Sequence, residues 1–333
     1  MKNTYEFTKE LIQKQKPQFA YKGKDLKTWQ PKAKEILRGL LGMEKFTFCN
    51  PDLQIEFEEQ HEDFTEIRFT FQSEEGYRVP CHLLLPNGVK NPPVMVCMQG
   101  HSKGMHISLA NPKFPGDEKD IKGGDRDFCI RAVKEGFAAI ALEMRNFGEL
   151  SCNNYNPQCY ESAVTNFLMG RTTIGERVWD FARLLDVIEQ NFQDLVDINN
   201  ICCMGNSGGG TATAYIAALE DRVKLAMPSC AMCTYKDSIG AMNHCACNYV
   251  PQIATYFDMG DLLAMAYPKY FIQVNGKEDN IFPIDAAKKV FQDGKKAYEE
   301  MGDSDKVAHV IGDEGHRFYA DPAWPIVHKM LGK

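Results

Sequence analysis

Long apolar segments are missing from this sequence. No uninterrupted apolar run approaches the roughly 18 residues that a membrane-spanning helix needs. The opening stretch, residues 1–19, lacks the apolar core of a secretory signal. Internal repeats and low-complexity tracts are absent as well. We therefore expect a cytoplasmic protein that does not bind membranes.

An excess of positive charge is also missing. The chain has 38 basic and 45 acidic side chains, which is a formal net charge of −7. An acidic surface repels a phosphate backbone, so nucleic-acid binding is not expected. The phosphate-binding pattern Gly-x-x-x-x-Gly-Lys-Ser/Thr does not occur, and the glycines at 208–210 lack the spacing of a dinucleotide fingerprint. We expect no cofactor.

What is present fits an ordinary globular protein. The chain has 333 residues, 44% of them hydrophobic and 25% charged, which suits two domains or one large one. Twelve cysteines occur without an export signal, so reduced thiols are expected rather than a disulfide framework.

Residues 1–50 are expected to form a helical N-terminal extension, in which an apolar stripe at 33–41 ends at Gly42. The apolar period then changes to two, and this alternation predicts three antiparallel strands at 54–57, 67–71 and 79–85.

Strands and helices alternate after residue 90. Short apolar runs predict buried strands at 94–98, 137–142, 198–204, 224–228, 270–274 and 307–311. Helices are expected at 173–192, 211–219, 283–301 and 322–331, the first opened by a capping box of Thr173 and Glu176. An antiparallel start followed by β-α units predicts an α/β domain over 51–333, with a mostly parallel sheet covered on both faces.

Two segments, 149–172 and 230–266, are longer than usual connections between a strand and a helix. Both follow strands, so we expect cap-like insertions at the carboxyl edge of the sheet, where α/β folds bind ligands.

The pentapeptide Gly205-Asn206-Ser207-Gly208-Gly209 lies between an expected strand and an expected helix. It matches the Gly-x-Ser-x-Gly nucleophile elbow in its required setting. The serine must occupy a strained turn to project its hydroxyl, and side chains two positions before or after it would clash, so glycine occupies both. An ordinary glycine-rich turn is the competing interpretation. The pattern favours Ser207 as a nucleophile.

A serine hydroxyl needs a base, and the expected order along the chain is Ser, then Asp or Glu, then His. Asp279 and His316 each follow a predicted strand, so both can meet Ser207 at one edge of the sheet. His316 would take the proton from Ser207, and Asp279 would orient the imidazole. Glu278 is the rival for the acid.

The reaction also needs two N–H donors for the developing oxyanion. We assign one to the backbone of Gly208, directly after the nucleophile. The other should come from the turn Gln99-Gly100-His101 after the strand at 94–98, where Gly100 permits close approach and His101 supplies the N–H.

Two segments offer candidate zinc ligands, Cys230-x-x-Cys233 and His244-Cys245-Ala246-Cys247. Neither spacing forms the usual paired knuckles, and cysteine is often a small buried hydrophobe. We expect no metal.

The chain resembles an α/β-hydrolase from about residue 50 to its end. Within that superfamily it resembles the acetyl xylan esterase and cephalosporin C deacetylase group and the dienelactone hydrolase-like esterases. The matching pieces are the Gln-Gly-His turn at 99–101, Met-Arg-Asn-Phe-Gly-Glu at 144–149, Gly-Asn-Ser-Gly-Gly at 205–209, the segment 276–283, and Gly315-His316. The resemblance implies a carboxylic ester hydrolase that acts through an acyl-serine without a cofactor.

The expected function is a serine esterase that deacetylates small or carbohydrate-type esters. A peptidase or amidase with the same triad, and a binding protein on the same fold, remain alternatives. The two insertions mix polar and aromatic residues, which suits a compact pocket for a short acyl group. The expected partner is a small-molecule ester, and homo-oligomerisation is left open.

Overall fold

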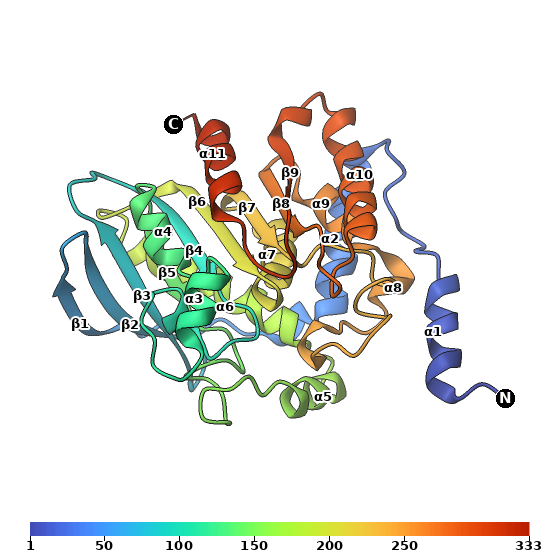
Figure 1. The fold of residues 1–333 in the computed structure, drawn as a ribbon, viewed down its shortest axis with the longest axis horizontal. Coiled ribbons are helices and arrows are strands. Elements are labelled where there is room, and N and C mark those ends of the chain that lie inside the picture. Colours follow the sequence, from blue (N-terminus) through green and yellow to red (C-terminus); the bar gives the residue numbers. More distant parts are fainter. Residues whose placement is uncertain (333) are drawn as a thin grey trace.

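The computed structural model describes residues 1–332. Within them, one sheet has the strand order β1-β2-β3-β5-β4-β6-β7-β8-β9 (Figure 1). The strands are β1 (Gln54–Gln60), β2 (Phe64–Glu74), β3 (Tyr77–Pro86), β4 (Pro93–Met98), β5 (Ala138–Leu142), β6 (Asp197–Asn206), β7 (Val223–Ser229), β8 (Tyr270–Gly276) and β9 (Val307–Gly312). Pairing is antiparallel from β1 to β5 and parallel from β5 to β9. The predicted sheet, with its antiparallel start, is confirmed.

Helices cover both faces of this sheet. They are α1 (Thr4–Lys14), α2 (Leu26–Leu41), α3 (Asp117–Gly123), α4 (Phe128–Lys134), α5 (Tyr160–Leu168), α6 (Thr173–Asn191), α7 (Gly208–Leu219), α8 (Ile253–Tyr256), α9 (Met259–Ala266), α10 (Ile284–Glu300) and α11 (Ala320–Leu331). Short 3₁₀ turns are η1 (Met43–Lys45), η2 (Met105–Ile107), η3 (Ala246–Asn248) and η4 (Ser304–Lys306). The apolar sides of α2, α6, α7, α9 and α10 share one core, and those of α4 and α11 share the other.

None of the helices within residues 1–332 combines the length and the apolar character that crossing a bilayer requires.

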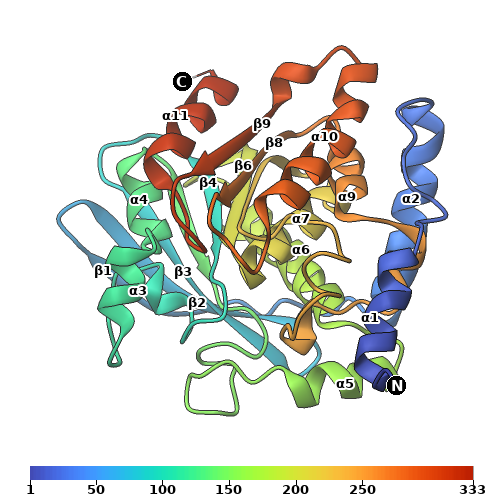
Figure 2. The same ribbon diagram turned by 45° about the vertical axis from the view of Figure 1, so that its right-hand side comes forward.

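The first two helices differ in how they attach. Helix α1 buries none of its side chains and lies at the periphery in both views (Figures 1 and 2). Helix α2 buries its apolar stripe in the main core and ends at Gly42, as expected. Gly42 has φ +72°, and a Cβ there would lie 2.1 Å from the carbonyl oxygen of Gly170. Glycine is therefore required at this position by both conformation and space.

Helix α6 begins at Thr173 as predicted, but its N-cap lies one residue before the predicted one. The N-cap is Thr172, whose hydroxyl accepts a hydrogen bond from the N–H of Gly175 at 3.0 Å. The predicted box of Thr173 and Glu176 is wrong, because with Thr172 as N-cap the N3 residue is Gly175, which has no side chain to return the bond. The Glu176 carboxylate instead pairs with Arg145 at 3.1 Å. A buried guanidinium competes more strongly for that carboxylate than a backbone N–H does.

The two long connections contain secondary structure of their own. Segment 149–172 holds α5, and segment 230–266 holds η3, α8 and α9. Helix α9 packs against α7 and α10 and connects two parallel strands, so it belongs to the framework of the sheet. Helix α5 contacts η3, which brings the two segments together.

Candidate active site

Ser207 lies in the sharp turn between β6 and α7. Its backbone has φ 56° and ψ −119°, a conformation that residues with a side chain rarely adopt. The N–H of Ser207 donates to the carbonyl of Ser229 at the end of β7, at 2.8 Å. The strand, tight turn and helix expected of a nucleophile elbow are all present.

The glycines around Ser207 are required by space. A Cβ on Gly205 would lie 2.5 Å from the carbonyl of Gly209, and one on Gly209 would lie 2.1 Å from the carbonyl oxygen of Met98. A Cβ on Gly100 would lie 2.9 Å from the Cβ of Ser207. The predicted close approach of the turn after β4 to the elbow is therefore confirmed, and any side chain at these glycines would separate the two.

Asp279 follows β8 and His316 follows β9, and the structure brings them together. His316 Nδ1 lies 2.8 Å from Asp279 Oδ2. The other carboxylate oxygen accepts the N–H groups of Ile281 at 2.8 Å and Phe282 at 3.1 Å. Asp279 is buried, whereas its rival Glu278 is exposed. Asp279 rather than Glu278 is therefore the acid that contacts the imidazole.

The environment keeps Asp279 ionised. Burial by itself would raise the pKa of Asp279, but the hydrogen bond from His316 and the two backbone N–H groups outweigh burial and lower it. Phe282 stacks on the His316 ring, with centroids 5.9 Å apart and an interplanar angle of 15°. The carboxylate and the aromatic ring together fix the orientation of the imidazole.

The end of β7 contacts both the nucleophile elbow and the Asp279–His316 pair. Cys230 follows Ser229 directly, and its sulfur lies within 4.8 Å of ligand atoms of both Asp279 and His316. Burial raises the pKa of Cys230 to about 12, so this thiol stays neutral at ordinary pH. In residues 1–332 no hydrogen bond joins the Ser207 hydroxyl to His316. The local sequence indicates Cys230 only as a candidate metal ligand, because Asp279 and His316 lie far from it along the chain.

The two residues assigned to the oxyanion hole are neighbours. Gly208 opens α7, where first-turn N–H groups have no partner within the helix. A Cβ on Gly208 would lie 3.0 Å from Nδ1 of His101. The backbone N–H of His101 has no acceptor in the described part of the chain. Both N–H groups are thus free to serve as donors, and their role stays a prediction.

The His101 side chain belongs to a second group of residues. Its Nε2 lies 3.2 Å from the sulfur of Cys247, and Cys159 and Cys245 complete the set. One ligand atom from each of the four residues lies within 4.8 Å of all the others. We call these four residues the thiol–imidazole cluster. Its donor atoms could hold a metal ion, and it adjoins the candidate oxyanion hole through His101.

Two further histidines have contrasting surroundings. His106 is buried against Asp117 at 2.8 Å, so its role is structural. His244 is partly buried, with Nε2 3.2 Å from the hydroxyl of Ser238. Burial and the charges of nearby His101 and His316 lower the pKa of His244. The His244 ring packs against Phe282, with centroids 5.5 Å apart, and Phe282 stacks on His316, so His244 lies near the candidate base.

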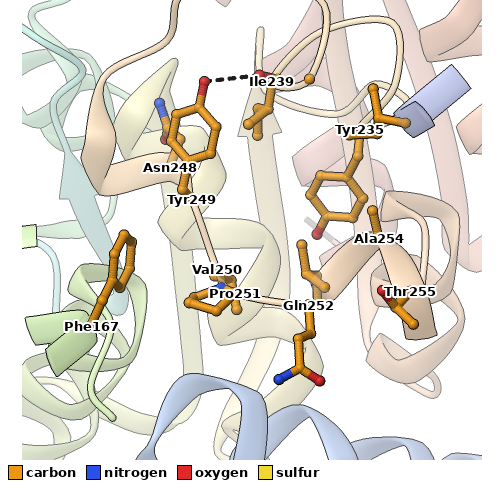
Figure 3. Close-up of a pocket in the computed structure, with 13 residues that line it drawn as sticks. Phe167, Tyr235, Ile239, Asn248, Tyr249, Val250, Pro251, Gln252, Ala254 and Thr255 are labelled. Carbon is orange, nitrogen blue, oxygen red and sulfur yellow. Dashed lines mark hydrogen bonds between the residues drawn. The ribbon is translucent and has the colours of Figure 1, made fainter. Parts of the chain in front are cut away.

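A mostly apolar pocket of about 360 Å³ lies away from this chemistry (Figure 3). It is formed by Ile12 of α1, Phe167 of α5 and residues of the 235–255 segment. The Tyr249 hydroxyl donates to the carbonyl of Ile239 at 3.1 Å (Figure 3). Neither the candidate nucleophile nor its acid and base line this pocket.

No family model matches this chain. A curated relative from Bacillus subtilis (strain 168), named "Putative hydrolase YtaP", is 23% identical over 246 residues, which cover 72% of this chain and 78% of the relative.

Solved structures are similar over nearly the whole chain. A protein described as "a putative acetyl xylan esterase" from Bacteroides fragilis superposes with a TM-score of 0.77 at 16% identity, covering 97% of this chain and 84% of that one. The glucuronoyl esterase from Solibacter usitatus gives a TM-score of 0.68 at 15% identity, with 96% and 97% covered. The acetyl xylan esterase from Paenibacillus sp. R4 gives 0.61 at 16% identity, with 97% and 98% covered. The expected resemblance is confirmed for the architecture: this chain has the α/β-hydrolase fold, and its structural neighbours are acetyl xylan esterases and glucuronoyl esterases.

Proposed function

We propose that this protein is a serine carboxylic ester hydrolase that removes short acyl groups, acetyl above all, from small or carbohydrate-type alcohols. One observation carries the proposal. A strained serine at the end of β6 and an Asp279–His316 pair with a buried carboxylate, at the ends of β8 and β9, occupy the same edge of the sheet. A general base oriented by a carboxylate is what a serine nucleophile needs.

Acylation begins at Ser207. With the His316 proton on Nδ1 and donated to Asp279, Nε2 is left as the base that accepts the serine proton. The serine oxygen attacks the ester carbonyl and forms a tetrahedral oxyanion. The N–H groups of Gly208 and His101 stabilise this charge. His316 then returns the proton to the leaving alcohol, and an acyl-serine remains.

Deacylation repeats these steps with water. His316 takes a proton from the water, the hydroxide attacks the acyl-serine, and the acid leaves as Ser207 regains its proton. Because Asp279 stays ionised throughout, it stabilises the imidazolium in both halves of the reaction.

The curated relative and the structural neighbours support the reaction class, since they are named as a hydrolase and as esterases of carbohydrate substrates. The composition of the two insertions supports the short acyl group. Residues 149–172 and 230–266 mix asparagine and tyrosine with methionine and phenylalanine. Their exposed large apolar side chains are Tyr249 and a stripe along α5, made of Tyr160, Val164, Leu168 and Met169, rather than the broad apolar face of a lipase lid.

A fluorophosphonate probe tests the chemistry directly. We expect labelling of the wild-type protein and none of Ser207→Ala. Absence of labelling in the folded wild type would favour a binding protein on this fold instead. A panel of acetylated sugars, methyl glucuronate, aryl esters and dipeptide amides then tests the substrate class. Faster turnover of the amides would replace the esterase proposal with a peptidase or amidase.

A further inference from the structure

The thiol–imidazole cluster brings together three segments that are far apart in the sequence. His101 follows β4, Cys159 caps the start of α5, and Cys245 and Cys247 flank Ala246 at η3. Cys159 and Cys247 are buried, while His101 and Cys245 are partly exposed. We propose that these four residues bind one Zn²⁺ ion as a closed Cys₃His site. This proposal stands independently of the esterase proposal.

The geometry of the donor atoms suits this ion. Zinc prefers four sulfur and nitrogen ligands in a tetrahedron, with Zn–S bonds of about 2.3 Å. Such a tetrahedron has sulfur–sulfur edges of about 3.8 Å, from the same bond length. The four donor atoms already lie within 4.8 Å of one another, so only a small contraction is needed. The Nε2 atom of His101, 3.2 Å from the sulfur of Cys247, is the ligand nitrogen.

A neighbouring cation provides an independent reason. Arg177 of α6 is 1% exposed, and its guanidinium interacts with the sulfur atoms of the cluster. Within residues 1–332 it forms no ion pair. One of its nitrogens donates to the carbonyl of Arg145 at 3.2 Å, the group lies 4.6 Å over the Phe147 ring, and its Nε and Nη1 lack partners. A buried cation is costly unless an anion lies beside it.

Cys247 provides part of that anion, because hydrogen bonds from Cys159 and Cys245 lower the pKa of its thiol. With zinc bound, three thiolates, one Zn²⁺ and a neutral imidazole carry a single net negative charge. The charge of Arg177 balances it. Zinc binding therefore explains why three thiols and an unpaired guanidinium are buried together.

Four protein ligands leave no open position, so the site is structural rather than catalytic. It ties both long insertions to the turn after β4. Because His101 would bind zinc through its ring, the ion would also hold that ring beside Gly208 and so restrict the turn that carries the backbone N–H of His101.

Metal analysis of the wild-type protein is the first test. The full chain is produced in zinc-supplemented medium and purified under reducing conditions without chelator. We expect one zinc per chain, and the Co²⁺-substituted protein should show the visible bands of a tetrahedral site with thiolate charge transfer. Wild-type protein that holds neither metal would overturn the proposal. So would denatured protein with ten free thiols instead of the twelve in the sequence, because that result indicates a disulfide.

Variants then assign the ligands. Cys159→Ser and Cys247→Ser should lose zinc, whereas Cys152→Ser should retain it. Cys152 is the matched control, because it lies in the same insertion as Cys159 but is exposed and outside the cluster. Stoichiometric zinc in the double variant of Cys159 and Cys247 would refute the assignment. If these variants fail to fold, the cobalt spectrum of the wild type still decides, since an octahedral spectrum without thiolate bands contradicts the site.

Discussion

The elbow with its acid–base pair and the thiol–imidazole cluster lie side by side, yet they are organised differently. Ser207, Asp279 and His316 each follow directly on a strand of the central sheet. In the cluster, only His101 follows a strand, whereas Cys159 and Cys245 are the N-caps of α5 and η3 and Cys247 lies within η3. Parallel strands bring residues at their ends together through regular backbone pairing, whereas the insertions need side-chain contacts to fix their position.

The largest effect should come from the nucleophile. Ser207→Ala removes the attacking oxygen, so we expect kcat on p-nitrophenyl acetate to fall by about 10⁵- to 10⁶-fold. Ser207→Ala combined with His316→Ala should be little worse, because the two residues act as one unit. A Ser207→Ala variant with more than a few per cent of wild-type activity would disprove the nucleophile assignment. Circular dichroism serves as the control for folding.

A smaller loss is expected at the acid. Asp279→Asn keeps the shape of the side chain but removes the charge that orients His316, so kcat should fall by about 10³- to 10⁴-fold. Glu278→Gln is the matched control, because Glu278 adjoins Asp279 but is exposed. Steady-state kinetics of both variants show which of the two carboxylates orients His316. A harmless Asp279→Asn together with a crippled Glu278→Gln would reverse the assignment.

The next prediction connects the two regions. His101→Ala retains the backbone N–H but removes the zinc-binding ring, so the N–H should be held less firmly. We expect kcat to fall about tenfold with KM little changed, less than the 10²- to 10³-fold cost of losing a donor entirely. Zinc content is measured on the same sample. Loss of zinc with unchanged kcat would show that the cluster does not position the oxyanion turn.

The smallest effect concerns the acyl chain. We expect p-nitrophenyl acetate to be hydrolysed several-fold faster than the butyrate, and the octanoate most slowly. An acyl pocket that accepted longer chains would gain about 0.8 kcal/mol per methylene, so its rates would rise with length. Comparing kcat/KM for the three esters distinguishes these cases. A maximum at eight carbons would overturn the short-acyl proposal and leave the hydrolase mechanism intact.

Local pattern predicted most of the fold and of the candidate active site. The strands, the turn at Gly42 and the glycines at 205 and 209 each follow from spacing along a few residues, because they depend on backbone geometry. The capping residue of α6 was misplaced by one position. The hydroxyl of the actual N-cap, Thr172, also donates to the carbonyl of Leu41 at 3.1 Å, a contact between distant segments that the local pattern does not show.

The sequence by itself determined the candidate nucleophile Ser207, the candidate base His316 and the order in which nucleophile, acid and base occur, since each lies in a short segment after a strand. Only the tertiary structure decided which acid contacts His316, by burying Asp279 and leaving Glu278 exposed. Only the tertiary structure, too, brought Cys159 and His101 to Cys245 and Cys247. The physical reason is the same in both cases. Contacts between distant segments depend on packing across the whole chain, and the spacing of residues along a short stretch does not specify that packing.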